Sequence, residues 1–153
     1  MAVIIKTKEQ IEILREGGHR LASILAKVAK KVAPGVTTKE LDEYAHKLIK
    51  EGGDEPAFLG YRPEGHPRAY PASLCTSTNN EIVHGIPKIS KTLREGGIIS
   101  IDLGLKHRGL FTDHAMTVAV GKISKPSQQL LNITNEALAV GITEARGGNA
   151  VGD

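Results

Sequence analysis

The stretch IISIDLGLKHRGLFTDHAMTVAV, residues 98–120, decides the fold of this chain. Two apolar runs, residues 98–105 and 110–120, flank the polar segment KHRG, which is typical of two strands joined by a tight turn. Each run carries one aspartate, Asp102 in the first and Asp113 in the second. The sequence therefore predicts a β-hairpin with one carboxylate on each strand.

The length of the turn determines how the two aspartates lie relative to each other. A two-residue turn at His107 and Arg108 places Asp102 directly opposite Asp113 on one face, with Cβ atoms roughly 4.5–5.5 Å apart. A three-residue turn with a bulge at Gly109 instead puts them on opposite faces, unless a second irregularity restores the register. Facing carboxylates repel each other and are costly to desolvate, so a cation between them is the simplest stabilising partner.

The composition is that of a globular protein with a mainly aliphatic core. The chain has 153 residues, enough for one domain with a real core. Only two Phe, three Tyr and no Trp are present, so aliphatic side chains must fill most of that core. The net charge of +3 is small and the basic residues are scattered, apart from a few lysines near an expected helix end. This charge pattern does not predict nucleic-acid binding.

The single cysteine and the short apolar runs bear on the location of the protein. Cys75 has no partner for an internal disulfide, which fits a reducing compartment. The apolar run at residues 2–5 is too short for a signal peptide, and no apolar stretch reaches the length of a membrane span. We expect a cytoplasmic protein with no membrane partner.

Helical patterns flank the hairpin on both sides. A capping box at Thr7–Gln10 begins a helix that ends before residues 34–35, a Pro-Gly pair. A second capping box at Thr37–Glu40 begins a shorter helix that ends at Gly52. A third helix is predicted at about residues 127–145 from its apolar periodicity.

The segments between these helices and the hairpin are less regular. Residues 73–78 are predicted to form a strand, residues 79–80 a turn, and residues 82–84 a return strand. Residues 54–71 contain four prolines and show no periodicity. A loop of this length is often functional, so we expect it to contribute to a binding site.

A weak internal repeat relates the two ends of the chain. Residues 146–153, after the third predicted helix, have the same turn-like character as residues 33–40 at an offset of 113. The identity is thin, essentially one glycine and one acidic residue. As a repeat, it predicts that the chain stops where a second copy of the helix after Glu40 should begin. The alternative interpretation is an ordinary frayed C-terminus.

Three residues are candidates for chemistry: His84, Asp102 and Asp113. A histidine beside a glycine at a strand end can act as an acid, an electrophile or a ligand, although taken alone it is more often structural. The pair of aspartates forms an oxygen-rich site, which suits hard or borderline divalent ions such as Mn²⁺, Mg²⁺, Co²⁺ or Fe²⁺. Two carboxylates can bridge two such ions, which together activate water and polarise a carbonyl group. Two aspartates do not saturate even one ion, so further ligands are required.

Five motifs occur together in this chain: FLGY at 58–61, YPASLC at 70–75, NNEIVHGIP at 79–87, Ile101-Asp102 and Thr112-Asp113. With these motifs the chain resembles the N-terminal half of the type I methionine aminopeptidases, a family with the pita-bread metallopeptidase fold. The resemblance covers essentially all of residues 4–153 and implies an α+β fold: half of a pita-bread, with an antiparallel sheet covered by helices on one face. A Pro-specific peptidase of the same superfamily is a lesser alternative, because HGIP favours the methionine branch.

The resemblance implies a role for each site residue. Asp102 and Asp113 bind two divalent metal ions (Co, Mn, Fe, Zn or Mg), and His84 is catalytic and contacts the substrate near the scissile amide. The substrate is a peptide or nascent protein that begins with methionine, and the reaction removes that methionine. The pocket for the methionine side chain, a flexible thioether that packs well against aromatic rings, is lined by Phe58, Tyr61, Tyr70 and Cys75.

Two departures from the family pattern limit these expectations. The family completes its metal site with one histidine and two glutamates from its second half, so three of five ligands are missing here. Residues 62–69 lengthen the substrate loop. We therefore expect residues 1–153 to be inactive alone and to act with a complementary C-terminal half or a second copy of the chain. The alternative is a non-catalytic, self-associating or binding half-domain of the same fold.

Overall fold

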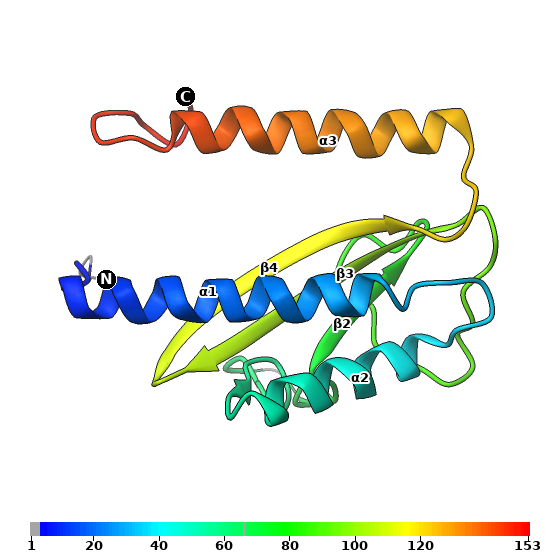
Figure 1. Ribbon diagram of the computed structural model, residues 1–153, viewed down its shortest axis with the longest axis horizontal. Coiled ribbons are helices and arrows are strands. Elements are labelled where there is room, and N and C mark those ends of the chain that lie inside the picture. The colour runs from blue at the N-terminus through cyan, green and yellow to red at the C-terminus, as the bar shows by residue number, and fades with distance from the viewer. Residues whose placement is uncertain (1–3, 66) are drawn as a thin grey trace.

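The computed structural model describes residues 4–65 and 67–153, which form an antiparallel sheet with helices (Figure 1). Strand β3 is central: it pairs with β1 and β2 along one edge and with β4 along the other. This α+β arrangement confirms the predicted fold class. The elements are α1 (Lys8–Ala29), α2 (Thr38–Glu51), β1 (Glu55–Pro56), β2 (Leu74–Thr78), β3 (Ile98–His107), β4 (Leu110–Ala119) and α3 (Lys125–Glu144).

One face of the sheet is the core and the other is open. In β3, side chains alternate between the two faces, and the apolar set is completely buried against α1 and α2. The prediction of helices on one face is therefore confirmed. The buried contacts join Ile99, Ile101, Leu103 and Leu105 of β3 to Leu21, Leu25 and Val28 of α1 and to Leu41, Ala45 and Ile49 of α2.

The two predicted capping boxes form as expected. The Thr7 hydroxyl accepts a hydrogen bond from the Gln10 N–H, and the Gln10 side chain accepts one from the Thr7 N–H. Thr37 and Glu40 make the same reciprocal pair at the start of α2. These bonds satisfy backbone donors that a helix start otherwise leaves unpaired, which is why both helices begin where the sequence indicates.

Buried carboxylates position the strands that carry the site. Asp42 of α2 accepts hydrogen bonds from the N–H groups of Ser73 (2.8 Å) and Leu74 (3.1 Å), which fixes the start of β2. Asp54, just after α2, lies 2.7 Å from His107 Nδ1 and accepts a hydrogen bond from Arg20 Nε at 2.8 Å. This second cluster joins α1, the loop after α2 and the turn end of the hairpin.

Helix α3 stands apart from the rest of the molecule (Figure 1) and buries none of its side chains. The segment that follows it reproduces the geometry of the segment before α2 at the offset of 113 seen in the sequence. In each segment a glycine has a positive φ, and the N–H two residues later donates to a carboxylate three residues further on. The residues are Gly35, Thr37 and Glu40 in the first segment and Gly148, Ala150 and Asp153 in the second.

Among the described residues, no helix combines the length and the hydropathy that crossing a bilayer requires.

Candidate metal and substrate site

The two aspartates lie on the open face of the sheet, as diagonal neighbours. Asp102 pairs with Ala115, and Asp113 pairs with Gly104 two residues along β3. Because residues two apart on a strand share a face, both carboxylates project from the same side. Diagonal positions are about 7–8 Å apart, still close enough for the two side chains to interact.

The predicted direct opposition of the two aspartates is wrong. The turn consists of Arg108 and Gly109, and His107 pairs with Leu110. Asp113 therefore lies opposite Gly104, two residues away from its expected partner Asp102. Arg108 and Gly109 have φ values of 48° and 85°, the positive pair that a two-residue type I′ hairpin turn requires. The shift preserves the shared face, and the alternative with a bulge does not occur.

Asp102 has the properties of an acceptor that lacks its partner. Its Oδ1 atom is buried and makes no hydrogen bond within the described part of the chain. Burial raises the pKa of Asp102, the neighbouring Asp113 charge raises it further, and His84 lowers it. A buried carboxylate oxygen without a donor is costly unless a cation binds it, so this donor set fits a divalent ion.

The ligand set that this chain supplies is partial. In residues 4–65 and 67–153, no group of three or more His, Cys, Asp or Glu side chains is placed to hold a metal ion. Asp102 and Asp113 therefore form at most a partial ligand set, to which the described residues bring no third side chain of these types.

His84 lies within electrostatic reach of Asp102 and has an unusual backbone conformation. Its φ is 58°, the left-handed region that a non-glycine residue rarely adopts, and its side chain is exposed. The predicted return strand at residues 82–84 is wrong, because these residues form no strand and Ile82 is 89% exposed. The left-handed turn at His84 redirects the chain so that the next residue, Gly85, approaches the edge of β2.

Three of the predicted pocket residues gather over the same face. The Phe58 and Tyr70 rings meet edge to face with centroids 6.4 Å apart. Cys75 is buried, and it is the β2 residue that pairs with Asp102 of the neighbouring strand β3. Burial raises the pKa of both the Cys75 thiol and the Tyr70 hydroxyl, so both remain neutral at physiological pH. The Tyr61 side chain is 62% exposed and lies at the rim.

The sequence reasoning missed Gly104, which makes room for Phe58. A Cβ atom at this position would lie 2.6 Å from Phe58 Cε1, so only glycine lets the ring approach β3. Gly104 is the partner of Asp113, so the ring lies next to the aspartate pair. A glycine inside an apolar strand often marks such a close approach, and that signal was available in the sequence.

Two backbone hydrogen bonds join the chain before residue 62 to the chain after residue 69. The Tyr70 N–H donates to the Tyr61 carbonyl at 2.8 Å, and the Gly60 N–H donates to the Tyr70 carbonyl at 2.9 Å. The two tyrosines of the predicted pocket are therefore held together where the segment 62–69 leaves the site.

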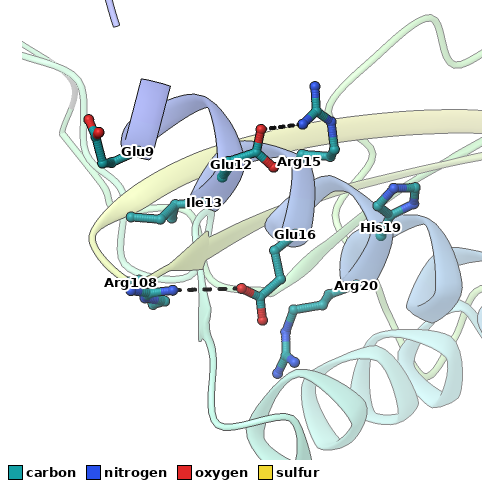
Figure 2. Close-up of a pocket in the computed structure, with 8 residues that line it drawn as sticks. All are labelled: Glu9, Glu12, Ile13, Arg15, Glu16, His19, Arg20 and Arg108. Atoms are coloured by element: carbon teal, nitrogen blue, oxygen red, sulfur yellow. Dashed lines mark hydrogen bonds and ion pairs between the residues drawn. The ribbon is translucent and has the colours of Figure 1, made fainter. Parts of the chain in front are cut away.

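A hollow lies away from this site, along α1 (Figure 2). It measures about 690 Å³ and contains none of the predicted site residues. Arg108 pairs with Glu16 at 3.7 Å and Arg15 pairs with Glu12, so its charges compensate one another. Its lining residues are Glu9, Glu12, Ile13, Arg15, Glu16, His19, Arg20 and Arg108. Nothing in it resembles a catalytic group set.

Known proteins are similar to this chain in sequence and in fold. The sequence profile of metallopeptidase family M24 matches residues 12–153. A methionine aminopeptidase from Aquifex aeolicus is 43% identical over 153 residues, which are all of this chain and 59% of the relative. Methionine aminopeptidase 1 of Bacillus subtilis is 42% identical over 146 residues, 95% of this chain and 56% of the relative.

The fold comparison agrees. The crystal structure of methionine aminopeptidase from Rickettsia prowazekii superposes with a TM-score of 0.85 and 30% sequence identity, covering 92% of this chain and 54% of that one. This chain thus spans little more than half the length of these relatives. Its sheet and helices are those of the pita-bread metallopeptidases, and by sequence and fold the chain belongs to metallopeptidase family M24.

Proposed function

We propose that this chain is the N-terminal half of a methionine aminopeptidase, which hydrolyses the first peptide bond of proteins that begin with methionine. One observation carries the proposal: Asp102, with an unpartnered buried oxygen, shares the open sheet face with Asp113 and lies within electrostatic reach of His84. The identity of 43% to a methionine aminopeptidase supports the choice of substrate. A cytoplasmic location belongs to the same proposal, on the strength of the single free cysteine.

Asp102 and Asp113 would hold the divalent metal ions in this proposal. When bound, such ions activate water and polarise the carbonyl group of the scissile bond. The two carboxylates suit Co, Mn, Fe, Zn or Mg ions, and the structure favours no one of these.

The other residues bind and orient the substrate. His84, exposed at the edge of the open face, contacts the scissile amide and assists the departing nitrogen. Phe58, Tyr70 and the neutral Cys75 thiol offer an apolar, uncharged surface for the methionine thioether, and Tyr61 closes its rim. The backbone hydrogen bond between Tyr61 and Tyr70 holds both ends of the segment 62–69 at the pocket, which makes this segment a candidate for controlling access to it.

Residues 1–153 alone should not turn over a Met-Ala peptide at a useful rate, even with Mn²⁺ or Co²⁺. The reason is the partial ligand set, since two carboxylates do not saturate a divalent ion. A complementary C-terminal half should restore activity. The test is a chimera in which this chain replaces the matching 59% of the Aquifex aeolicus relative, assayed beside the chain alone. Turnover by the isolated chain at the chimera's rate would refute the half-domain proposal.

A second candidate function is a non-catalytic half-domain that self-associates. It is favoured by α3, in which five large apolar residues are more than half exposed: Leu130, Ile133, Leu138, Val140 and Ile142. Such a surface normally marks an interface. Analytical ultracentrifugation at tens of micromolar tests this candidate, and a strict monomer counts against it.

A further inference from the structure

We propose that Ser77 is a positioning residue for His84: its hydroxyl holds the Gly85 peptide so that His84 stays at the open sheet face that carries Asp102. That His84 acts on a substrate rests on the proposed function. The arrangement of Ser77, Gly85 and His84 does not, because it follows from the contacts of this chain alone.

The Gly85 residue is clamped on both of its polar groups. Its N–H donates to Ser77 Oγ at 3.1 Å. Its carbonyl accepts a hydrogen bond from the Thr76 N–H at 2.7 Å and lies 3.2 Å from Tyr70 Oη. Gly85 is buried whereas its neighbour His84 is exposed, so the clamp fixes the backbone and leaves the histidine side chain free to contact a ligand.

The approach to β2 leaves no space at Gly85. A Cβ atom there would overlap the Thr76 carbonyl, so the segment lies directly on the strand backbone. The turn into this contact requires the positive φ of His84. A left-handed non-glycine residue costs about 1–2 kcal/mol, so His84 needs compensating interactions to remain in it. The hydrogen bond from Gly85 to Ser77 is one of them, and Ser77 is the only side chain to which the structure shows the Gly85 N–H donating.

The register of β2 and β3 explains why this clamp serves the metal site. Ser77 pairs with Ser100, and Cys75 pairs with Asp102, so all four side chains share the open face. A peptide held at Ser77 therefore lies only two residues along the strands from the pair formed by Cys75 and Asp102. The effect of His84 on the pKa of Asp102 agrees with this proximity.

The first experiment measures the clamp in the 153-residue chain by NMR. Ser77→Ala should raise the hydrogen-exchange rate of the Gly85 amide about three- to tenfold, because a net hydrogen bond of about 1 kcal/mol is lost. The scalar couplings of His84 should show loss of its positive φ. Ser77→Thr, which keeps a hydroxyl, should restore both. The matched control is Ser100→Ala, which removes a hydroxyl from the same face that bonds Thr117 instead. Unchanged Gly85 exchange and His84 couplings in a folded Ser77→Ala variant would overturn the proposal.

The second experiment separates positioning from a merely structural role. In the chimera with the Aquifex aeolicus relative, Ser77→Ala should lower kcat about 10- to 100-fold with KM and metal content nearly unchanged, since small misplacements of catalytic groups act on the chemical step. Equal losses of metal and of kcat would show a structural role and overturn the proposal, as would an unchanged kcat. If the chimera itself is inactive, the proposed function fails, and the NMR measurement alone decides whether Ser77 positions His84.

Discussion

At the scale of single residues, Asp102 shows the conflict between stability and function. Its carboxylate is partly buried in an apolar sheet, and burial and Asp113 raise its pKa above 3.8. A raised carboxyl pKa means that the folded state binds the proton more tightly than the unfolded state. The charge of Asp102 therefore costs stability at neutral pH, and this cost disappears below pH 3.8.

The first prediction follows from this cost. In the presence of a chelator, Asp102→Asn should raise the free energy of unfolding at pH 7 by about 1 kcal/mol, the usual size of the gain when a functional group is removed. The gain should vanish at pH 3, where the wild-type carboxyl is protonated. Urea denaturation at both pH values measures it, and Glu136→Gln, which changes an exposed carboxylate on α3, is the control. A loss of stability at pH 7 would contradict this description of Asp102.

Glu81 shows the opposite behaviour. Its carboxylate accepts hydrogen bonds from Lys91 Nζ (2.6 Å) and the Thr78 N–H (2.7 Å), which together lower its pKa to about 2. A lowered pKa stabilises the fold above the ordinary value of 4.5, and this contribution is lost as the pH falls towards 2. These bonds fix the turn that leads from β2 to His84.

The second prediction concerns this carboxylate. Glu81→Gln should lower the free energy of unfolding at pH 7 by less than about 1 kcal/mol, because the Glu81 side chain is 38% exposed and solvent screens its ion pair. The difference between variant and wild type should shrink between pH 4.5 and pH 2. Denaturation curves across this range check it, and a difference that stays constant with pH would rule out the ionised Glu81 as its source.

At the scale of elements, the hairpin and the segment after β2 show what sequence reasoning can and cannot reach. Alternating apolar residues located β3 and β4, because burial of one face imposes a period of two. The register was missed because Arg108 takes a positive φ, which a sequence pattern does not reveal for a non-glycine residue. Residues 82–84 look like a strand by composition, but the clamp of Gly85 on β2 overrides that local preference.

The sequence indicated several residues of the candidate site but not how they are arranged in space. The two aspartates and His84 stand out from the sequence, and family motifs suggested the pocket. Gly104, Ser77 and Gly85 were missed because their importance depends on contacts between segments far apart in the chain, such as the Phe58 ring against β3. Such contacts leave little trace in local sequence periodicity.

The third prediction belongs to the cluster that ties the elements together. Asp54 is 5% exposed and contacts both His107 and Arg20. Asp54→Ala should lower the free energy of unfolding by about 1–3 kcal/mol, because it removes the hydrogen-bond partner of the buried His107 Nδ1 and of Arg20 Nε. Chemical denaturation at pH 7 measures this effect. Glu51→Ala, which removes an exposed carboxylate at the end of α2, should change stability by less than about 0.5 kcal/mol. A similar small effect at Asp54 would show that the cluster is not structural.

At the scale of the whole molecule, the sheet has one covered face and one open face, and the open face carries the residues proposed to bind metal and substrate. The repeated geometry around Gly35 and Gly148 agrees with a fold built from two similar units. The unburied helix α3 and the partial ligand set among the described residues are the features that the proposed complementary half would cover and complete.

The most direct test of the central claim is the metal-dependent cleavage of a Met-Ala peptide by the chimera with the Aquifex aeolicus relative. We predict that the chimera is active with added Mn²⁺ or Co²⁺, and that Asp102→Ala and Asp113→Ala each abolish turnover and reduce bound metal. Glu55→Ala should leave both unchanged, because Glu55 is a carboxylate on the same sheet that pairs with Lys106. Full activity and metal content in either aspartate variant would contradict the assignment of these residues as metal ligands.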